Sequence, residues 1–302
     1  MKNLFITALM LGWAVAGSAQ LLSVSGVEKV NLPAGMEADQ AVISPDGTFV
    51  VMSINSDRSL QRLDLTTGKA VKVAENGSML GLEFTDDSRS IVYRQSTTND
   101  KHLRYTAVKA VDLATGAETT VVKPTRKLNG FAVEGRDIAS VENKRFHATN
   151  IDGVKAAKVP VASIYYGQLL VTVDGKTKAI NPNGKEGCSY LWPSVSPDGT
   201  KVLYYLGSDG CYVCDIDGGN PVRIGVIRAP RWIDNQTIVG MRGSNDGISY
   251  TESAIIAANL NGVEQTLTGS DVIALNPSVS GDGTKIAFST PEGNLYIINI
   301  NR

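Results

Sequence analysis

The sequence predicts an all-β fold, a seven-bladed β-propeller of four-stranded antiparallel blades, with a six-bladed ring as the alternative. The main observation is a recurring phrase: residues 43–51, 195–203 and 279–287 each place Ser-x-Asp-Gly-Thr between apolar runs, and residues 84–92 hold a weaker copy. A turn that returns between strand-like segments about every 40 residues is typical of propeller repeats. No segment after the first 19 residues has apolar residues at helical spacing.

Residues 1–19 are predicted to be a secretory signal peptide. Lys2 precedes an apolar run over residues 4–16, and the small residues Gly17, Ser18 and Ala19 form a cleavage site before Gln20. The run is shorter than the roughly 20 apolar residues that span a bilayer, and no second run of that length follows, so we expect no transmembrane segment. The sequence therefore predicts a periplasmic or secreted protein whose residues 20–302 form a single propeller domain.

The chain divides into seven units of strands bounded by Gly, Pro, Asn and Asp. The first covers about residues 38–76, with strands predicted at 40–43, 49–54, 60–64 and 70–74. The second runs to about residue 123, the third covers about 124–159, the fourth 160–187, and the others open near residues 188, 229 and 276. The third and fourth units depart most from the repeat, and the fourth is the shortest.

The seventh unit ends one strand short, after residues 295–300. The missing strand is predicted to come from the other end of the chain, where residues 27–32 would pair with residues 295–300 and close the ring. Such closure removes sheet edges that would otherwise invite aggregation.

The repeated turn has a local physical explanation. In residues 44–48, Pro presets the φ of a turn corner, Asp bonds backbone groups of its own turn, and Gly takes a positive φ. Asp215 to Gly218 is similar to a fragment of a calcium loop, but the terminal Glu of an EF-hand is missing. We therefore interpret these Asp residues as turn formers and predict no metal site.

The turn phrases resemble the WD40-like Pro-Asp repeat of the TolB-type β-propeller family. The resemblance is carried by residues 44–47, 193–199, 215–221 and 277–283. It implies a scaffold for protein or ligand contacts and no single chemistry. TolB-type propellers have six blades, whereas we count seven units here.

Composition and motifs argue against several function classes. The 29 basic and 30 acidic residues nearly cancel, so bulk charge indicates no nucleic-acid partner. There is no Gly-x-Ser-x-Gly motif. The two histidines are placed in a long loop, His102, and in an alternating strand, His147. We expect no cofactor and a protein that is not an enzyme, although a carboxylate pair brought together by the ring stays open.

Three cysteines leave two alternatives. Cys211 and Cys214 have C-x-x-C spacing but lie in one predicted strand, where residues three apart face opposite sides, so we interpret them as packing residues. Cys188 lies in the loop that enters the fifth unit, and Cys211 comes just after the loop of residues 207–210. We expect both loops on the same face, so a disulfide between the two cysteines could form in the oxidising compartment. The alternative is three reduced thiols.

A binding face is predicted from the two longest loops, residues 95–104 and 242–252. Trp, Tyr and Arg are the residue types that dominate binding hot spots. The candidate binding residues are His102, Arg104, Tyr190, Trp192, Arg231, Trp232, Arg242 and Tyr250. For Trp192 and Trp232 the alternative is packing between blades.

These observations favour a non-catalytic binding module for an unidentified protein, peptide or glycan ligand, expected to be a monomer. One alternative is a propeller hydrolase or lyase acting on a glycan or peptide. A second alternative is a structural subunit of an envelope complex.

Overall fold

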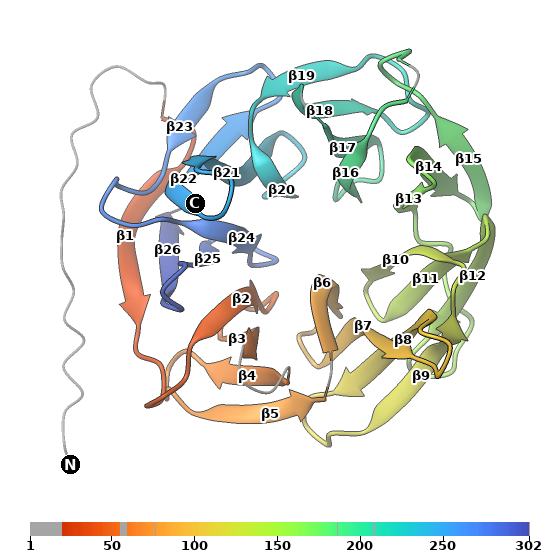
Figure 1. Cartoon of the computed structure of the whole chain (residues 1–302), viewed down its shortest axis with the longest axis horizontal. Helices are drawn as coiled ribbons and strands as arrows, with labels where there is room; N and C mark the ends of the chain where they lie inside the picture. The colour runs from red at the N-terminus through yellow and green to blue at the C-terminus, as the bar shows by residue number, and fades with distance from the viewer. Residues whose placement is uncertain (1–19, 55–58, 76, 186, 208, 302) are drawn as a thin grey trace.

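Seven antiparallel sheets surround a central axis in the computed structural model, which confirms the predicted seven-bladed β-propeller (Figure 1). The structure describes residues 20–54, 59–75, 77–185, 187–207 and 209–301. The predicted signal peptide lies outside these residues. The described part contains strands and no helix, and therefore no helix that could span a membrane.

Five of the sheets have four strands. Blade one contains β2 (Ala38–Ile43), β3 (Phe49–Ile54), β4 (Leu60–Asp64) and β5 (Ala70–Ala74). Blade two contains β6 (Gly77–Phe84), β7 (Ser90–Thr98), β8 (Arg104–Asp112) and β9 (Glu118–Thr125). Blade five contains β16 (Tyr190–Val195), β17 (Lys201–Leu206), β18 (Gly210–Asp215) and β19 (Val222–Gly225). Blade six contains β20 (Arg228–Trp232), β21 (Thr237–Asn245), β22 (Tyr250–Asn259) and β23 (Glu264–Thr266).

Blade seven takes its fourth strand from the start of the chain, and this strand begins and ends earlier than the predicted residues 27–32. It contains β24 (Leu275–Val279), β25 (Lys285–Ser289), β26 (Leu295–Asn301) and β1 (Ser23–Val30). β1 pairs antiparallel with β26, from Ser23 opposite Asn301 to Val30 opposite Leu295. The backbone N–H groups of Leu21 and Leu22 also donate to Gln265 Oε1 of blade six, at 2.7 and 2.8 Å. The two ends of the chain are thus held in one blade.

Blades three and four have three strands each, where four were predicted. Blade three contains β10 (Leu128–Glu134), β11 (Asp137–Glu142) and β12 (Arg145–Asn150). Blade four contains β13 (Val161–Tyr165), β14 (Gln168–Val173) and β15 (Lys176–Ile180). These are the two units whose sequences depart from the repeat.

The core is divided among the seven interfaces between neighbouring blades. Successive side chains of a strand point to opposite faces of its sheet, so each blade contributes to two clusters. Val50 packs with blade seven, for example, and Val51 packs with blade two. The interface of blades three and four has the smallest cluster, formed by Ala139, Val141, Val159 and Val161.

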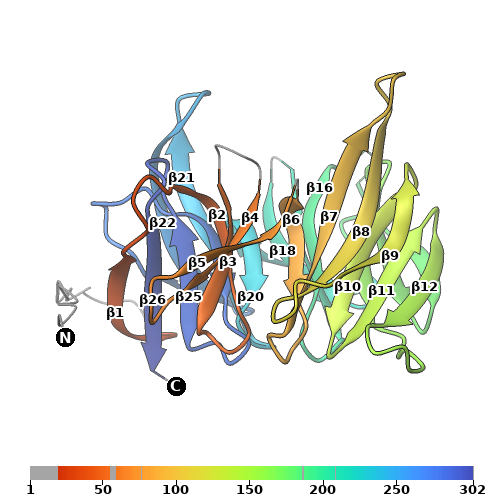
Figure 2. The same cartoon turned by 90° about the horizontal axis from the view of Figure 1, so that it is seen from below.

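The two faces of the ring carry different structures (Figure 2). On one face, here called the hairpin face, the β7–β8 and β21–β22 hairpins project beyond the other blades. On the opposite face, the turn face, lie the repeated turns that join the first and second strands of a blade. The β26 end of the chain also lies on the turn face.

The repeated turns form the predicted network. In blade five, Ser196 Oγ donates to Asp198 Oδ1 at 2.6 Å, and Lys201 N donates back to Ser196 Oγ at 2.9 Å. Gly199 has a φ of 72°. Hydrogen bonds to this carboxylate, led by that of Ser196, lower the pKa of Asp198. The Asp residues of this motif therefore act as turn formers.

Turns of neighbouring blades also bond to one another. Gly281 N donates to Pro45 O at 2.9 Å, and Asp46 N donates to Ser88 Oγ at 3.0 Å. Ser88 occupies the position that Gly holds in the other copies and has a φ of 58°. These bonds link blade seven to one and blade one to two on the turn face.

The three-stranded blades reverse the direction of one innermost strand. Blade three starts on the hairpin face with β10 and, because it has three strands, ends on the turn face with β12. The next strand, β13, therefore begins on the turn face. Two contacts support this direction of β13. Pro160, just before β13, is next to Gly199 in a repeated turn of the turn face, where a Cβ on Gly199 would be 3.8 Å from Pro160 Cγ. At the other end, Tyr165 Oη donates to Asn143 Oδ1 in the β11–β12 turn at 3.2 Å. The second three-stranded blade restores the direction, so that β16 again starts at the hairpin face.

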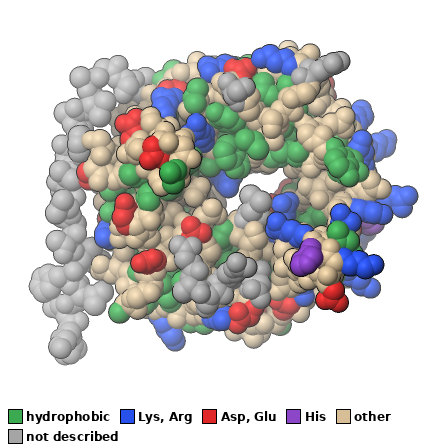
Figure 3. Space-filling view, viewed as in Figure 1, with side chains coloured by type: hydrophobic (Ala, Val, Ile, Leu, Met, Phe, Trp, Pro, Cys, Tyr) green, Lys and Arg blue, Asp and Glu red, His purple; other side chains and the backbone are tan. Residues whose placement is uncertain are grey.

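The innermost strands β2, β6, β10, β13, β16, β20 and β24 surround the axis (Figure 1). Figure 3 shows the hairpin face hollowed at its centre, with hydrophobic and aromatic side chains gathered beside the opening over β16 and β20. This central channel and its rim are therefore the first places to examine for function.

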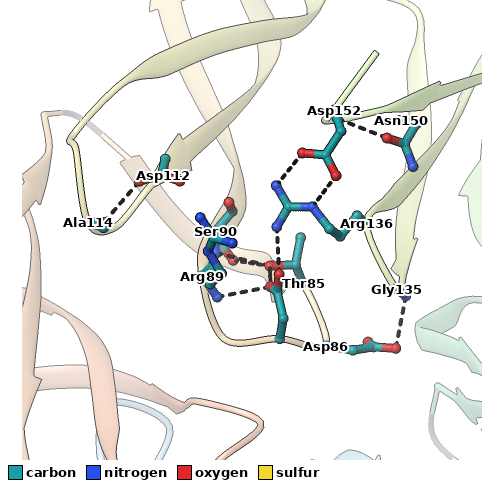
Figure 4. Close-up of polar contacts among 11 residues, drawn as sticks. Thr85, Asp86, Arg89, Ser90, Asp112, Ala114, Gly135, Arg136, Asn150 and Asp152 are labelled. Carbon is teal, nitrogen blue, oxygen red and sulfur yellow. Dashed lines mark hydrogen bonds and ion pairs between the residues drawn. The ribbon is translucent and has the colours of Figure 1, made fainter. Parts of the chain in front are cut away.

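On the turn face, an arginine joins blades two and three (Figure 4). Arg136 donates through Nε and Nη2 to the two carboxylate oxygens of Asp152, at 2.6 and 2.7 Å, and through Nη1 to Asp87 at 2.7 Å. Gly135 N donates to Asp86 Oδ2 at 2.9 Å. Blade three is thus anchored to blade two by polar contacts, although its own turn lacks the repeated phrase.

Candidate functional site at the hairpin face

The two predicted long loops are mostly strand. β7 and β8 are paired as far as Thr98 opposite Arg104, and β21 and β22 as far as Asn245 opposite Tyr250. The polar side chains that suggested loops instead pair across the strands. Ser96 Oγ and Thr106 Oγ1 are 3.4 Å apart, and Ser244 Oγ donates to Glu252 at 2.7 Å. The predicted loops are thus rigid ribbons with short tips.

The tip of the first hairpin holds two of the predicted residues. His102 is exposed and has a φ of 57°, and its N–H donates to Asn99 O at 2.9 Å. Arg104 is exposed and donates through Nε and Nη2 to Ser96 Oγ, at 3.0 and 2.9 Å. These side chains lie on a projecting arm and not at the channel rim.

An aromatic and arginine cluster lies on blades five and six, here called the rim cluster: Trp192, Tyr205, Arg228 and Tyr250. Trp192 and Tyr205 pack between these two blades, whereas Tyr250 packs against the core between blades six and seven. The rings of Trp192 and Tyr205 meet edge to face, 5.6 Å between centroids. Burial lowers the pKa of Arg228, but interactions with Tyr205 and Tyr250 outweigh it and raise that pKa above its usual value. Arg228 also donates to Gly243 O of the second hairpin at 3.5 Å.

Local backbone features set the position of Trp192. The ladder between β16 and β17 shifts register between Leu191 and Ser194, and Trp192 within this bulge has a φ of 48°. Bulges re-aim side chains, and a non-glycine residue at positive φ is uncommon. Trp192 is half-buried and packs on the cluster between blades five and six. The sequence alternative, packing between blades, is therefore correct for this residue, which also keeps exposed surface.

Three other predicted residues are outside the rim cluster. Tyr190 is buried, and its hydroxyl donates to Asn181 at 2.9 Å, so it belongs to the core. Trp232 also packs between blades five and six, as the alternative proposed. Arg242 is exposed but paired with Glu264 at 2.6 Å in the outermost strand of blade six.

The channel holds charged groups that the sequence did not reveal, together with the predicted Arg231. Glu83 lies on β6, the innermost strand of blade two, and Arg231 lies on β20, the innermost strand of blade six. Their charges interact, although two blades separate them on the shorter way around the ring. Both side chains therefore lie on the channel side of their blades, but no ion pair joins them among the described residues, and Arg231 Nη1 donates instead to Pro230 O at 3.2 Å.

Glu83 is a half-buried carboxyl group. Burial raises its pKa to about 7, and this effect is opposed by the N–H of Val133 and by Arg94 and Arg231. Val133 N donates to Glu83 Oε2 at 2.7 Å. Arg94 packs on the Phe131 ring at 5.6 Å, and within the described chain its buried Nε has no hydrogen-bond partner. In the sequence, the only indication of a carboxyl group at this position of the channel is that the charged Glu83 stands between the apolar Leu82 and Phe84.

The predicted disulfide between Cys188 and Cys211 is not formed in the structure, which has three free cysteines. Cys211 belongs to the core facing blade six, whereas Cys188 packs against the core facing blade four. The two residues thus lie on opposite faces of blade five. Cys214 faces blade four, so the C-x-x-C cysteines are on opposite faces, as predicted. Burial raises the pKa of both Cys211 and Cys214 to about 12.

The described residues contain no group of three or more His, Cys, Asp or Glu side chains that could hold a metal ion. Of the two histidines, His147 is exposed on β12, far along the chain from the tip that carries His102. The candidate site is therefore built from aromatic rings, guanidinium groups and one half-buried carboxyl group.

No family model and no curated protein sequence matches the chain. Solved structures do resemble it. An oligogalacturonate lyase from Vibrio parahaemolyticus superposes with a TM-score of 0.58 at 14% identity, over 93% of this chain and 96% of that chain. A chain of a mitotic checkpoint complex superposes with a TM-score of 0.61 at 11% identity, over 97% of this chain and all of that one. At these identities the likeness concerns the propeller fold alone, and the resemblance to the WD40-like repeat stays a prediction.

Proposed function

We propose that this protein is a non-catalytic binding module that takes a protein, peptide or glycan ligand on its hairpin face, in the periplasm or outside the cell. The rim cluster carries the proposal. Trp192 and Arg228 lie on the innermost strands β16 and β20, Tyr250 interacts with Arg228, and all three are half-buried. The β21–β22 hairpin projects from the same face (Figure 2). Aromatic and Arg side chains on a rigid scaffold supply contact area at a low entropic cost, which is why they dominate hot spots.

The two hairpins favour a ligand larger than the opening. They project from blades two and six, on different sides of the channel (Figure 2). A ligand seated on the rim cluster would therefore lie between two arms, one tipped by His102 and Arg104. Because both arms are paired strands, they would be ordered before binding and lose little entropy on contact.

The test is a ligand screen with matched variants. The mature protein would be screened against peptide and glycan panels, and affinities for each ligand found would be compared among wild type, Trp192→Ala, Tyr250→Ala and the control Arg89→Ala on the turn face. We expect Trp192→Ala and Tyr250→Ala to lose about 2 kcal/mol, or roughly 30-fold in Kd, and the control to be unchanged. Unchanged affinity in both rim variants would place the site elsewhere.

A second candidate function rests on Glu83. A carboxyl group whose pKa is raised to about 7, on an innermost strand and under the influence of Arg94 and Arg231, has the properties required of a general acid or base for an anionic substrate. This supports the alternative of a propeller lyase or hydrolase. The resemblance in fold to an oligogalacturonate lyase suggests oligogalacturonates as the first substrates to assay.

Glu83→Gln separates the two candidates. If the channel is catalytic, cleavage of the substrate panel between pH 5 and 8 should follow the ionisation of Glu83 and be lost in Glu83→Gln. If the protein is a binding module, neither protein turns over any panel member, and ligand affinity at the rim cluster is the same in both. Turnover that persists in Glu83→Gln would exclude this residue as the catalytic group.

A further inference from the structure

The outer edge of blade three is an open strand. In the described chain β12 pairs with β11 alone, whereas in the four-stranded blades the third strand is covered by a fourth. We propose that β12 binds an acidic, extended peptide segment of a partner protein, which adds to blade three as its fourth strand. This surface is distinct from the hairpin face.

The ladder identifies the backbone groups that would bind. Residues of an antiparallel strand alternate between those that bond the partner strand and those that point away from it. Ile151 N donates to Arg136 O at 3.1 Å. Counting back by two along β12, the backbone groups of Thr149, His147 and Arg145 also face β11. Phe146 and Ala148 therefore direct their N–H and C=O groups to the open side. Ala148 is also exposed, so a strand could approach it.

No described strand pairs with this edge, although Gly175 in the β14–β15 turn lies against the Phe146 ring. The connection from β12 to β13 is held at the turn face, where Ala157 N donates to Asp137 Oδ2 at the start of β11, at 3.1 Å. Residues 152–155 of this connection are exposed and do not pack over the strand. The position that a fourth strand takes in the other blades is thus open to an added segment.

A groove of about 520 Å³ lies beside the open edge, on the side facing blade two. Its walls come from β9 and from the β11–β12 hairpin, and include Lys123, Thr125, Ser140, Glu142, His147 and Thr149. This volume is in the range of ligand pockets, about 300–1,000 Å³. An added strand would direct every second side chain towards this groove, which is how β-augmentation sites obtain specificity.

The positive charge around the open edge of β12 favours an acidic peptide. The exposed basic side chains of this outer wall are Lys123, Arg126, Arg145, Lys155, Lys158, Lys176 and Lys178. None of them forms an ion pair within the described residues. Lys and Arg also gather on the side of the molecule where β12 and β15 lie (Figures 1 and 3). The acids nearby are Glu142, which is half-buried in the groove wall, Asp152, which is paired with Arg136, and Asp174, which is exposed in the β14–β15 turn.

This charge excludes a second copy of the chain as the preferred occupant. Two β12 edges would bring the same basic side chains together, and like charges placed opposite each other oppose pairing. An acidic segment would neutralise them. Blade seven shows that a strand distant in sequence can complete a blade, because β1 pairs along the whole of β26.

The experiment uses a fluorescein-labelled peptide of alternating Glu and Val, its Lys-Val counterpart, and heparin as a polyanion that cannot form a strand. Binding to the mature protein is followed by fluorescence anisotropy. We expect the Glu-Val peptide to bind and the Lys-Val peptide to bind at least about tenfold more weakly. Hydrogen exchange should slow at the amides of Phe146 and Ala148 when the Glu-Val peptide is bound.

Ala148→Pro and Ala179→Pro form a matched pair. Both residues are exposed alanines on the outermost strand of a three-stranded blade, and by the same alternation both point away from their hairpin partner. Proline is tolerated at such edge positions but removes the donor. Ala148→Pro should weaken Glu-Val binding about tenfold while Ala179→Pro leaves it unchanged, with thermal unfolding confirming that both variants fold.

Three results would overturn the proposal. They are no binding of the Glu-Val peptide, equal binding of both peptides, and equal binding to Ala148→Pro and wild type. If heparin competes and Ala148→Pro has no effect, the surface attracts polyanions by charge alone and no strand is added.

Discussion

The third strands of blades three and seven, β12 and β26, differ in whether a fourth strand covers them. β26 is an apolar strand, with Leu295, Ile297, Ile298 and Ile300 buried, and β1 covers it. Among the described strands none pairs with the outer side of β12, and its sequence carries Arg145, His147 and Thr149, all exposed. An apolar edge needs a partner strand, whereas charged side chains can protect an open one. The comparison indicates why blade seven takes in the N-terminal strand and blade three leaves its edge open.

The same contrast extends to the direction of the chain. After a single three-stranded blade, the innermost strand of every later blade would run in the opposite direction, because the chain would leave that blade on the turn face and not on the hairpin face. Blades three and four together restore the original direction. The cost is a small interface between them, built on Ala139, Val141, Val159 and Val161.

The strongest test removes β1 and leaves blade seven with three strands and an apolar edge. A chain that begins at Pro33 should lose roughly 5 kcal/mol or more, comparable with the whole stability of many domains, and should aggregate. Soluble yield, gel filtration and thermal unfolding against the chain from Gln20 measure this. A synthetic peptide of residues 20–32 should restore solubility. A soluble monomer with an unchanged melting temperature would show that the edge needs no cover.

A smaller effect compares two core valines. Val51 and Val141 are fully buried on the second strands of blades one and three. Val51→Ala should cost about 2 kcal/mol, and Val141→Ala about 1 kcal/mol, because the smaller cluster around Val141 leaves fewer neighbours to lose contact. Denaturant unfolding of both variants gives the difference. Equal costs would mean that blade three is packed as tightly as blade one.

The smallest effect concerns the turns. Asp198 forms the repeated turn in blade five, whereas Asp174 lies in the hairpin turn of blade four with a φ of 52°. Asp198→Asn should cost about 1 kcal/mol near neutral pH, because it weakens charge-assisted hydrogen bonds from Ser196 and Thr200. Asp174→Asn should be neutral within about 0.5 kcal/mol, since Asn tolerates a positive φ.

The stability difference between wild type and Asp198→Asn should depend on pH. The folded-state pKa of Asp198 is below its ordinary value of 3.8. Its stabilisation is therefore present above about pH 4 and is lost as the pH falls through the folded pKa. The stability difference between wild type and Asp198→Asn should shrink in acid. A difference that stays constant from pH 7 to pH 2 would contradict the assigned role of this carboxylate.

Much of the fold follows from the sequence because turn chemistry and strand alternation are local. Asp198 and Gly199 form their turn with neighbours a few residues away, and Cys211 and Cys214 face opposite sides through the two-residue period of the strand. The closure of blade seven was predictable from counting strands. The sequence by itself thus determined the fold class, the seven blades and the pairing of the chain ends.

Only the tertiary structure decided what the ring brings together. Glu83 and Arg231 influence each other electrostatically from different blades although their residue numbers differ by 148, and nothing near either residue signals the other. Tyr190 is in the core and Trp192 at the rim because a bulge changes the backbone between Leu191 and Ser194. The separation of Cys188 from Cys211 and the reversal of β13 depend likewise on blade position. Local rules act within a strand or a turn, whereas these features depend on how seven sheets close into one ring.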